Sequence, residues 1–92
     1  MNSKNLKADF AIDDGTATIT YHRIEGSPYA YLYEVNHPMV FEPYYLVMRR
    51  KRDVYNVEMF PQPEHLGVWA FLYFTLDKAM EHFRRLDLFK EQ

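Results

Sequence analysis

The chain has 92 residues, of which 48% are apolar, 17% aromatic and 26% charged, with a net charge of −2. This composition is typical of one globular domain, and it excludes both a disordered chain and a protein whose overall positive charge binds nucleic acid indiscriminately. Because there is no cysteine, disulfides, thiolate nucleophiles and sulfur-based zinc sites are excluded as well. We therefore expect one domain that spans residues 1–92.

The N-terminal segment has no apolar run of the kind found in signal peptides. The longest uninterrupted apolar run is Val68–Phe74, which is far shorter than the roughly 20 residues needed to span a bilayer. We expect a soluble, cytoplasmic protein without membrane contact.

Alternating apolar and polar residues predict short strands over residues 7–12, 16–24, 29–35, 44–48 and 54–60. Between the first two, Asp13–Gly15 is typical of a tight hairpin turn. Residues 38–43 begin and end with proline and are expected to form an edge piece or a loop. The apolar run 68–74 fits a buried strand or a buried helix, and its aromatic and β-branched content favours the strand.

Residues 75–89 predict an amphipathic helix with Thr75 as its N-cap. Apolar residues recur at helical spacing, and polar residues, including His82, take the other side. The sequence therefore predicts an α+β fold: a single small domain with an antiparallel sheet of about five strands and one C-terminal amphipathic helix packed on one face. The second face must be covered by solvent, a long loop, a second subunit or a partner.

Motifs for common catalytic chemistry are absent. There is no G-x-S-x-G sequence, and Gly15, Gly26 and Gly67 are isolated turn residues instead of a phosphate-binding loop. The four histidines have no chelating spacing, so no metal or other cofactor is expected and no catalytic residue is assigned. One enzymatic alternative stays open, a small ribonuclease that would use Arg49–Arg52, Tyr55 and His65.

Two groups of residues are candidate binding surfaces. Four of the eleven Lys and Arg residues are consecutive, namely Arg49, Arg50, Lys51 and Arg52. The rest of the chain has seven Lys and Arg residues and thirteen Asp and Glu residues. At the bend between two predicted strands, these cations are either a solvated tip or a contact for phosphates or an acidic protein. The second group, Tyr29, Tyr31 and Tyr33, lies on one face of a strand and either covers the sheet beneath the helix or forms a protein interface.

In profile, the chain resembles small proteins encoded by phages and other mobile elements, including anti-CRISPR proteins. The shared features are a length under a hundred residues, an α+β pattern, no cysteine, no catalytic motif and unevenly distributed charge. The resemblance implies a stoichiometric inhibitor or adaptor that occupies a surface of a protein or ribonucleoprotein complex. The leading hypothesis is thus a non-enzymatic binding protein that contacts its partner through Arg49–Arg52, with possible phosphate-backbone contact, and through the three tyrosines; a housekeeping homodimer is the other alternative.

Overall fold

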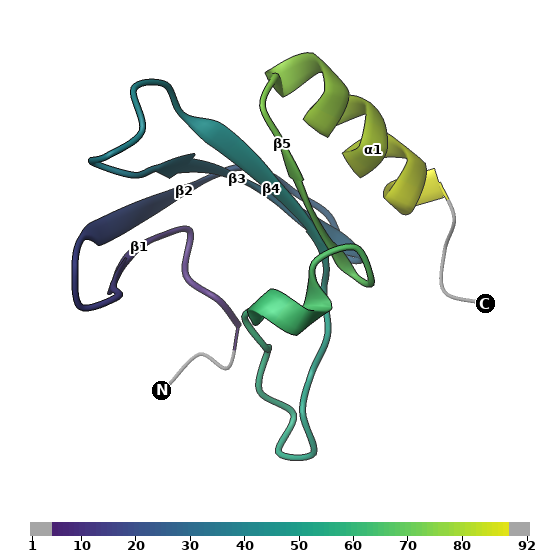
Figure 1. The fold of residues 1–92 in the computed structure, drawn as a ribbon. Helices are drawn as coiled ribbons and strands as arrows, with labels where there is room; N and C mark the ends of the chain where they lie inside the picture. The colour runs from purple at the N-terminus through teal and green to yellow at the C-terminus, as the bar shows by residue number, and fades with distance from the viewer. Residues whose placement is uncertain (1–4, 89–92) are drawn as a thin grey trace.

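A computed structural model describes residues 5–88, so both ends of the expected domain, residues 1–4 and 89–92, lie outside the described part. The described chain forms a five-stranded antiparallel sheet with one C-terminal helix (Figure 1). The predicted α+β class is confirmed. The strands are β1 (Asp9–Asp13), β2 (Thr18–Gly26), β3 (Ala30–Asn36), β4 (Tyr44–Arg49) and β5 (Ala70–Tyr73), and the helix is α1 (Leu76–Leu88).

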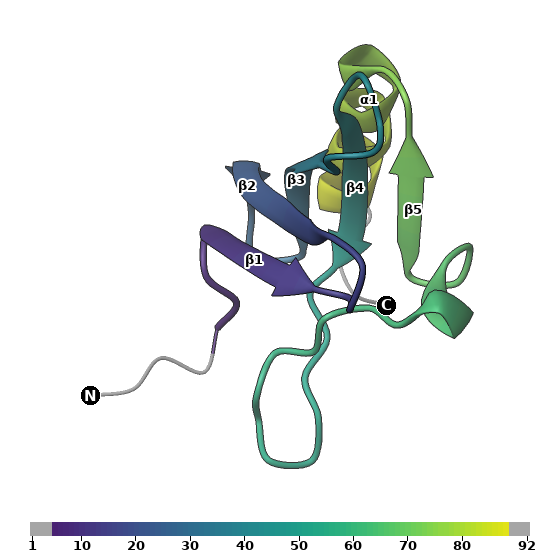
Figure 2. The ribbon, with the colours of Figure 1, turned by 60° about the vertical axis from the view of Figure 1, so that its left-hand side comes forward.

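Strand order in the sheet follows chain order, β1-β2-β3-β4-β5, and every neighbouring pair is antiparallel. The first three connections are short. The fourth, residues 50–69, is long and contains a 3₁₀ turn, η1 (Pro63–His65). Figure 2 shows the first part of this connection extending away from the end of β4 before the chain returns to the sheet.

The first hairpin turns where Asp13–Gly15 predicts it. Asp13 pairs with Thr18, and Gly15 takes a positive φ of 97°, which an L side chain rarely adopts. The Asp14 carboxylate accepts hydrogen bonds from the backbone N–H groups of Thr16 and Ala17, both at 2.9 Å. These bonds favour the charged form, so they lower the pKa of Asp14. Local sequence alone determines this turn.

Helix α1 covers one face of the sheet. Thr75 is the predicted N-cap, and its Oγ1 accepts a long hydrogen bond of 3.4 Å from the N–H of Lys78. The apolar stripe of the helix is buried against β3 and β4, where Ala79, Phe83 and Leu86 pack with Ala30, Leu32 and Val47. His82 departs from the prediction: it is half-buried against β5, and its Nδ1 lies 2.6 Å from the hydroxyl of Tyr73.

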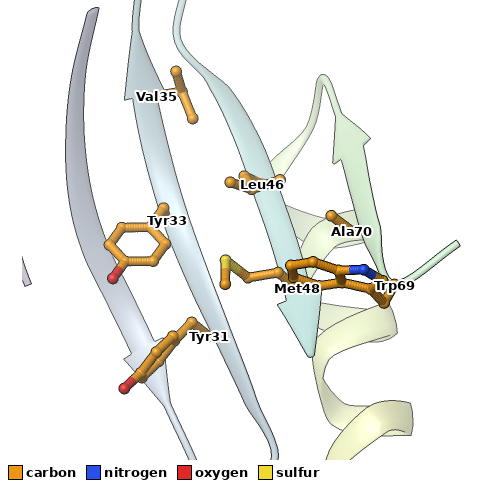
Figure 3. Packing of buried hydrophobic residues seen from close by; sticks show 7 residues of the cluster. All are labelled: Tyr31, Tyr33, Val35, Leu46, Met48, Trp69 and Ala70. Atoms are coloured by element: carbon orange, nitrogen blue, oxygen red, sulfur yellow. The ribbon is translucent and has the colours of Figure 1, made fainter. Parts of the chain in front are cut away.

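The opposite face of the sheet is covered by the chain itself. It carries the second apolar cluster, whose buried members Figure 3 shows: Tyr31, Tyr33, Val35, Leu46, Met48, Trp69 and Ala70. Phe10 and Tyr21, from the curled β1–β2 hairpin, stack at 4.9 Å and meet Phe60 of the long connection edge to face. The sequence left four possibilities for this face: solvent, a long loop, a second subunit or a partner. The structure shows the long connection 50–69 on this face, together with the β1–β2 hairpin.

The predicted strand at 54–60 is wrong. That segment belongs to the long connection, where Asp53 caps a turn and Asn56 takes a positive φ of 63°. A single bridge, Arg52 to Glu58, joins its two sides. The run 68–74 supplies the strand instead, because Ala70–Tyr73 pairs with β4. Residues 38–43 form a loop, as expected.

Candidate binding surfaces

We expected the four consecutive cations to form one accessible patch, but their side chains lie in different surroundings, although Arg49, Arg50 and Lys51 line one small hollow. β4 ends at Arg49, and side chains of an extended chain alternate between the two sides of a sheet. Arg49 therefore lies on the helix side, where its charge lowers the pKa of His82 after the larger effects of burial and of Arg85. Arg50 turns to the opposite side. Lys51 is exposed, as expected of a solvated tip, and no ion pair joins it to a carboxylate among the described residues.

Arg50 and Arg52 converge on one buried carboxylate, that of Glu58. Arg50 Nε lies 2.5 Å from Glu58 Oε2, and Arg52 Nη2 lies 3.8 Å from the same oxygen. The Glu58 side chain is only 1% exposed, and its Oε1 also accepts hydrogen bonds from the Tyr31 hydroxyl at 2.7 Å and the Leu6 N–H at 2.9 Å. The predicted accessible bend is therefore wrong for Arg50, which ties the long connection to the sheet, whereas the Arg52 side chain stays 35% exposed.

Electrostatics in this network follow from its hydrogen bonds. Burial raises the pKa of Glu58, but bonds from the Leu6 N–H, Arg50 and Tyr31 outweigh it, so the pKa lies below its ordinary value. Burial and the bond to Glu58 raise the pKa of Tyr31 to about 12. Glu58 is thus a carboxylate and Tyr31 a neutral phenol at neutral pH, and both act as structural groups.

The tyrosine row does not offer a surface. Tyr31 and Tyr33 are 3% and 0% exposed, so the expected exposure of these two side chains is wrong. The alternative that they lie beneath the helix is wrong too, since they belong to the cluster on the other face of the sheet. Tyr29, which precedes β3, is half-buried and lines a shallow hollow with Arg49, Arg50 and Lys51.

Sequence reasoning missed Arg23 of β2. Its guanidinium carbon lies 3.9 Å from the centroid of the Tyr31 ring, a cation–π contact, and its Nη2 donates to the Leu6 carbonyl at 2.6 Å and the Tyr33 hydroxyl at 3.2 Å. The signal was present, because alternation along β2 places Arg23 on the same face as Ile19 and Tyr21. A cation on the apolar face of a strand needs a specific partner.

Exposed apolar side chains gather at the end of the sheet opposite to the cations. In the β3–β4 loop, Met39 is 82% and Phe41 100% exposed, and just after β5 Phe74 is 81% exposed. Tyr44, the first residue of β4, joins the two segments, since its ring lies 6.4 Å from that of Phe74. We call Met39, Phe41, Tyr44 and Phe74 the apolar end.

An apolar groove begins at this end and follows the face that α1 leaves uncovered. It has a volume of about 400 Å³. Tyr44 lines it, with Val35, Leu46 and Leu72 from the sheet and Phe60 from the long connection, and Asp14 and Gln62 are among its few polar residues. Tyr44 therefore links the groove to Phe74, and Met39 and Phe41 lie in the loop that precedes Tyr44.

The residues considered for a ribonuclease are dispersed. His65 belongs to η1, where its ring lies 4.8 Å from that of Trp69 and its Nδ1 accepts from the Gln62 N–H. Tyr55 is 75% exposed in the turn of the long connection. Neither residue lines the two hollows that contain Arg50. Within residues 5–88 no three His, Asp or Glu side chains gather as metal ligands would, and no helix is long and apolar enough to cross a membrane.

Comparisons of the chain with protein-family models, with curated proteins and with solved structures found no match. The surfaces described above are therefore interpreted from their own geometry and chemistry.

Proposed function

We propose that the chain is a non-enzymatic binding protein, a small stoichiometric inhibitor or adaptor, that holds a protein partner through the apolar end and the adjoining groove. The observation that carries the proposal is the exposure of Met39, Phe41 and Phe74, which are more than four-fifths exposed at one end of a small domain. Elsewhere in the sheet, large apolar side chains are packed on both faces. Large apolar side chains exposed together at one end of a domain are typical of interaction sites.

The geometry supports a protein as the partner. Phe41 and Phe74 project as apolar side chains, and the groove beside them is concave, so the surface both inserts side chains and accepts one. Full burial of one such side chain contributes about 1.5–3 kcal/mol, and a central cluster of aromatic residues is typical of the energetically dominant part of protein interfaces. Exposed carboxylates, Glu42 and Asp77, flank the apolar residues in the sequence, so the partner surface should be apolar with a basic rim.

This proposal keeps the class of function that the anti-CRISPR-like profile implies but moves the contact surface. The arginine run is a poor choice for the contact with protein because Arg50 and Arg52 are bound to Glu58. Replacing them would disturb folding and binding together. Substitutions of Met39, Phe41 or Phe74 remove exposed side chains and should leave the fold intact.

A matched pair of variants tests the proposal. The wild-type protein, Phe41→Ser and the control Val54→Ser, whose side chain is 91% exposed in the long connection, are each immobilised and exposed to lysate of a host cell. We expect the wild type and Val54→Ser to retain the same protein in a one-to-one ratio and Phe41→Ser to lose it at least tenfold. Equal retention by Phe41→Ser, with an unchanged unfolding midpoint, would refute the proposal.

The same variants distinguish the homodimer alternative from binding to a different protein. Light scattering at micromolar concentration should give the mass of one chain for the wild type. A wild-type mass of two chains that falls to one chain in Phe41→Ser would mean that the apolar end serves self-association, and the proposed partner function would then be wrong.

A further inference from the structure

A hollow beside the buried tyrosines is lined by two arginines. Its volume is about 520 Å³, and it lies between the turn after β2 and the start of the described chain, with Arg23, Tyr31 and Arg50 on its sides; its other lining residues are Asn5, Gly26, Ser27 and Pro28. A smaller hollow of about 230 Å³ shares Pro28 and Arg50 with it and adds Tyr29, Arg49 and Lys51. The two hollows thus adjoin at Arg50.

The larger hollow, lined by Arg23, Tyr31 and Arg50, has more positive than negative charge around it. The Tyr31 ring lies 3.9 Å from the guanidinium carbon of Arg23 and 4.7 Å from that of Arg50, so the two guanidinium groups gather beside one ring. Among the described residues, Glu58 is the one carboxylate that pairs with Arg50, and it is shared with Arg52. Arg23 forms no ion pair with a described carboxylate. An otherwise acidic molecule therefore has a local excess of positive charge here.

Both arginines are held in place and still have donors left. Arg23 is fixed through Nη2, which donates to the Leu6 carbonyl and the Tyr33 hydroxyl. Its Nε is buried and has no hydrogen-bond partner among the described residues, so Nη1 is the donor group that is left for a ligand. Arg50 is fixed through Nε on Glu58 and through Nη1, which donates to the Ser27 carbonyl at 3.0 Å. A guanidinium has five N–H donors, so each group retains some for a ligand. Side chains already ordered by the fold lose little entropy when a ligand binds.

The chemistry of the site matches phosphate. Guanidinium groups bind phosphate oxygens with oriented, charge-assisted hydrogen bonds, and the ammonium of exposed Lys51 in the adjoining hollow adds a point charge. Two cationic hollows that share Arg50 suit a ligand with more than one phosphate, and a nucleic acid strand carries one at each nucleotide. Tyr29, which is half-buried, lines the second hollow with these cations, and an aromatic ring is a surface on which an unpaired base stacks.

We propose that Arg23, Arg50 and Lys51 bind consecutive phosphates of a single-stranded nucleic acid. The site is separate from the apolar end, so it stands or falls independently of the proposed protein partner. Affinity should be modest because few phosphates are neutralised and the rest of the chain is acidic, with a Kd of roughly 10⁻⁵ M at low salt.

The salt dependence of binding gives a quantitative test. For single strands the slope of log K against log salt is about −0.7 for each neutralised phosphate, so three contacts predict a slope of about −2. Fluorescence anisotropy with a labelled single strand of about 12 nucleotides should give this slope, and Arg23→Gln should weaken binding and bring the slope closer to zero by about 0.7. Arg84→Gln, the same change of charge on the exposed face of α1, is the matched control and should bind like the wild type.

Several outcomes overturn the proposal. A slope near zero, or equal weakening in Arg84→Gln and Arg23→Gln, would show that no local site exists. If Arg23→Gln fails to fold, Lys51→Gln replaces it, because that side chain is exposed and its loss should leave the fold intact. Competition by millimolar inorganic phosphate would support the phosphate chemistry. A doubly phosphorylated peptide that binds as tightly as the oligonucleotide would refute the choice of nucleic acid.

Discussion

Glu58→Gln should cause a large loss of stability. The carboxylate of Glu58 is buried, accepts bonds from Leu6 and Tyr31, and pairs with Arg50 at 2.5 Å. Glutamine keeps the shape but removes the charge, and its NH₂ group must face a donor. Because breaking a buried ion pair from one side costs about 3–5 kcal/mol, and glutamine retains part of the hydrogen bonding, we expect a loss of about 3 kcal/mol in the free energy of unfolding.

Chemical denaturation at pH 7 measures this loss. The chain has a single tryptophan, Trp69, which is 7% exposed, so its fluorescence reports the unfolding of the core. In a domain of this size each kcal/mol lowers the Tm by about 4–8 °C, which predicts a fall of roughly 12–24 °C. Glu64→Gln makes the same chemical change at an exposed position of η1 and should stay within about 0.5 kcal/mol of the wild type. If the two variants unfold alike, the network around Glu58 does not stabilise the fold as we describe.

The pH dependence of the same comparison tests the electrostatic part of the reasoning. The pKa of Glu58 is lowered in the folded protein relative to its ordinary value of 4.5. A carboxylate of this kind contributes stability that is complete above the pKa of the unfolded state and is lost as the pH falls through the folded pKa. The free energy of unfolding of the wild type should therefore exceed that of Glu58→Gln down to pH values near 4.5, and this difference should disappear only at lower pH. An advantage that already disappears above pH 5 would show that burial, and not hydrogen bonding, dominates the pKa of Glu58.

Two further predictions concern the first hairpin and the helix. Gly15→Ala should lower the free energy of unfolding by about 1 kcal/mol because an L side chain disfavours the φ of 97°, although no atom would lie within 4 Å of the new Cβ; an unchanged denaturation midpoint would contradict this. The pKa of His82 is lowered by burial and by the charges of Arg85 and Arg49, so His82 should titrate below 6.5 by NMR, and the protein should lose stability as the pH falls through 6.5, where the unfolded chain takes up the proton more readily. A His82 resonance that titrates above 6.5 would show that the Tyr73 contact stabilises the imidazolium instead.

Local rules made much of the fold predictable. Periodicity identified β1 to β4 and α1, the turn chemistry of Asp13–Gly15 fixed the first hairpin, and Thr75 marked the start of the helix. These features depend on residues close to one another in sequence, so a single chain is enough to recognise them.

The strand prediction for residues 54–60 is wrong because the segment alternates as a strand does but has no neighbouring strand to pair with. β5 occupies the position beside β4, which leaves Tyr55 and Val57 75% and 39% exposed and Glu58 buried, the reverse of the predicted faces. A local signal opposed the strand: Asp53 accepts bonds from the N–H groups of Tyr55 and Val57, and Asn56 tolerates a left-handed conformation. Turn chemistry therefore outweighs a two-residue period in a short segment.

The candidate sites were harder to predict because charge that is adjacent in sequence is not adjacent in space. Side chains of an extended segment alternate between the two sides of a sheet, so Arg49 and Arg50 leave the chain on opposite sides. Arg23 and Arg50, far apart in the chain, meet beside Tyr31. The sequence contained one anomaly that points to this meeting, the cation Arg23 on the apolar face of β2. A charge placed among apolar neighbours is unfavourable unless it is paired or hydrogen-bonded, so Arg23 predicts a polar partner nearby. Searching for isolated charges on apolar faces would have found Arg23, which the search for runs of like charge overlooked, but Glu58 lay on the predicted polar face of 54–60 and gave no such signal.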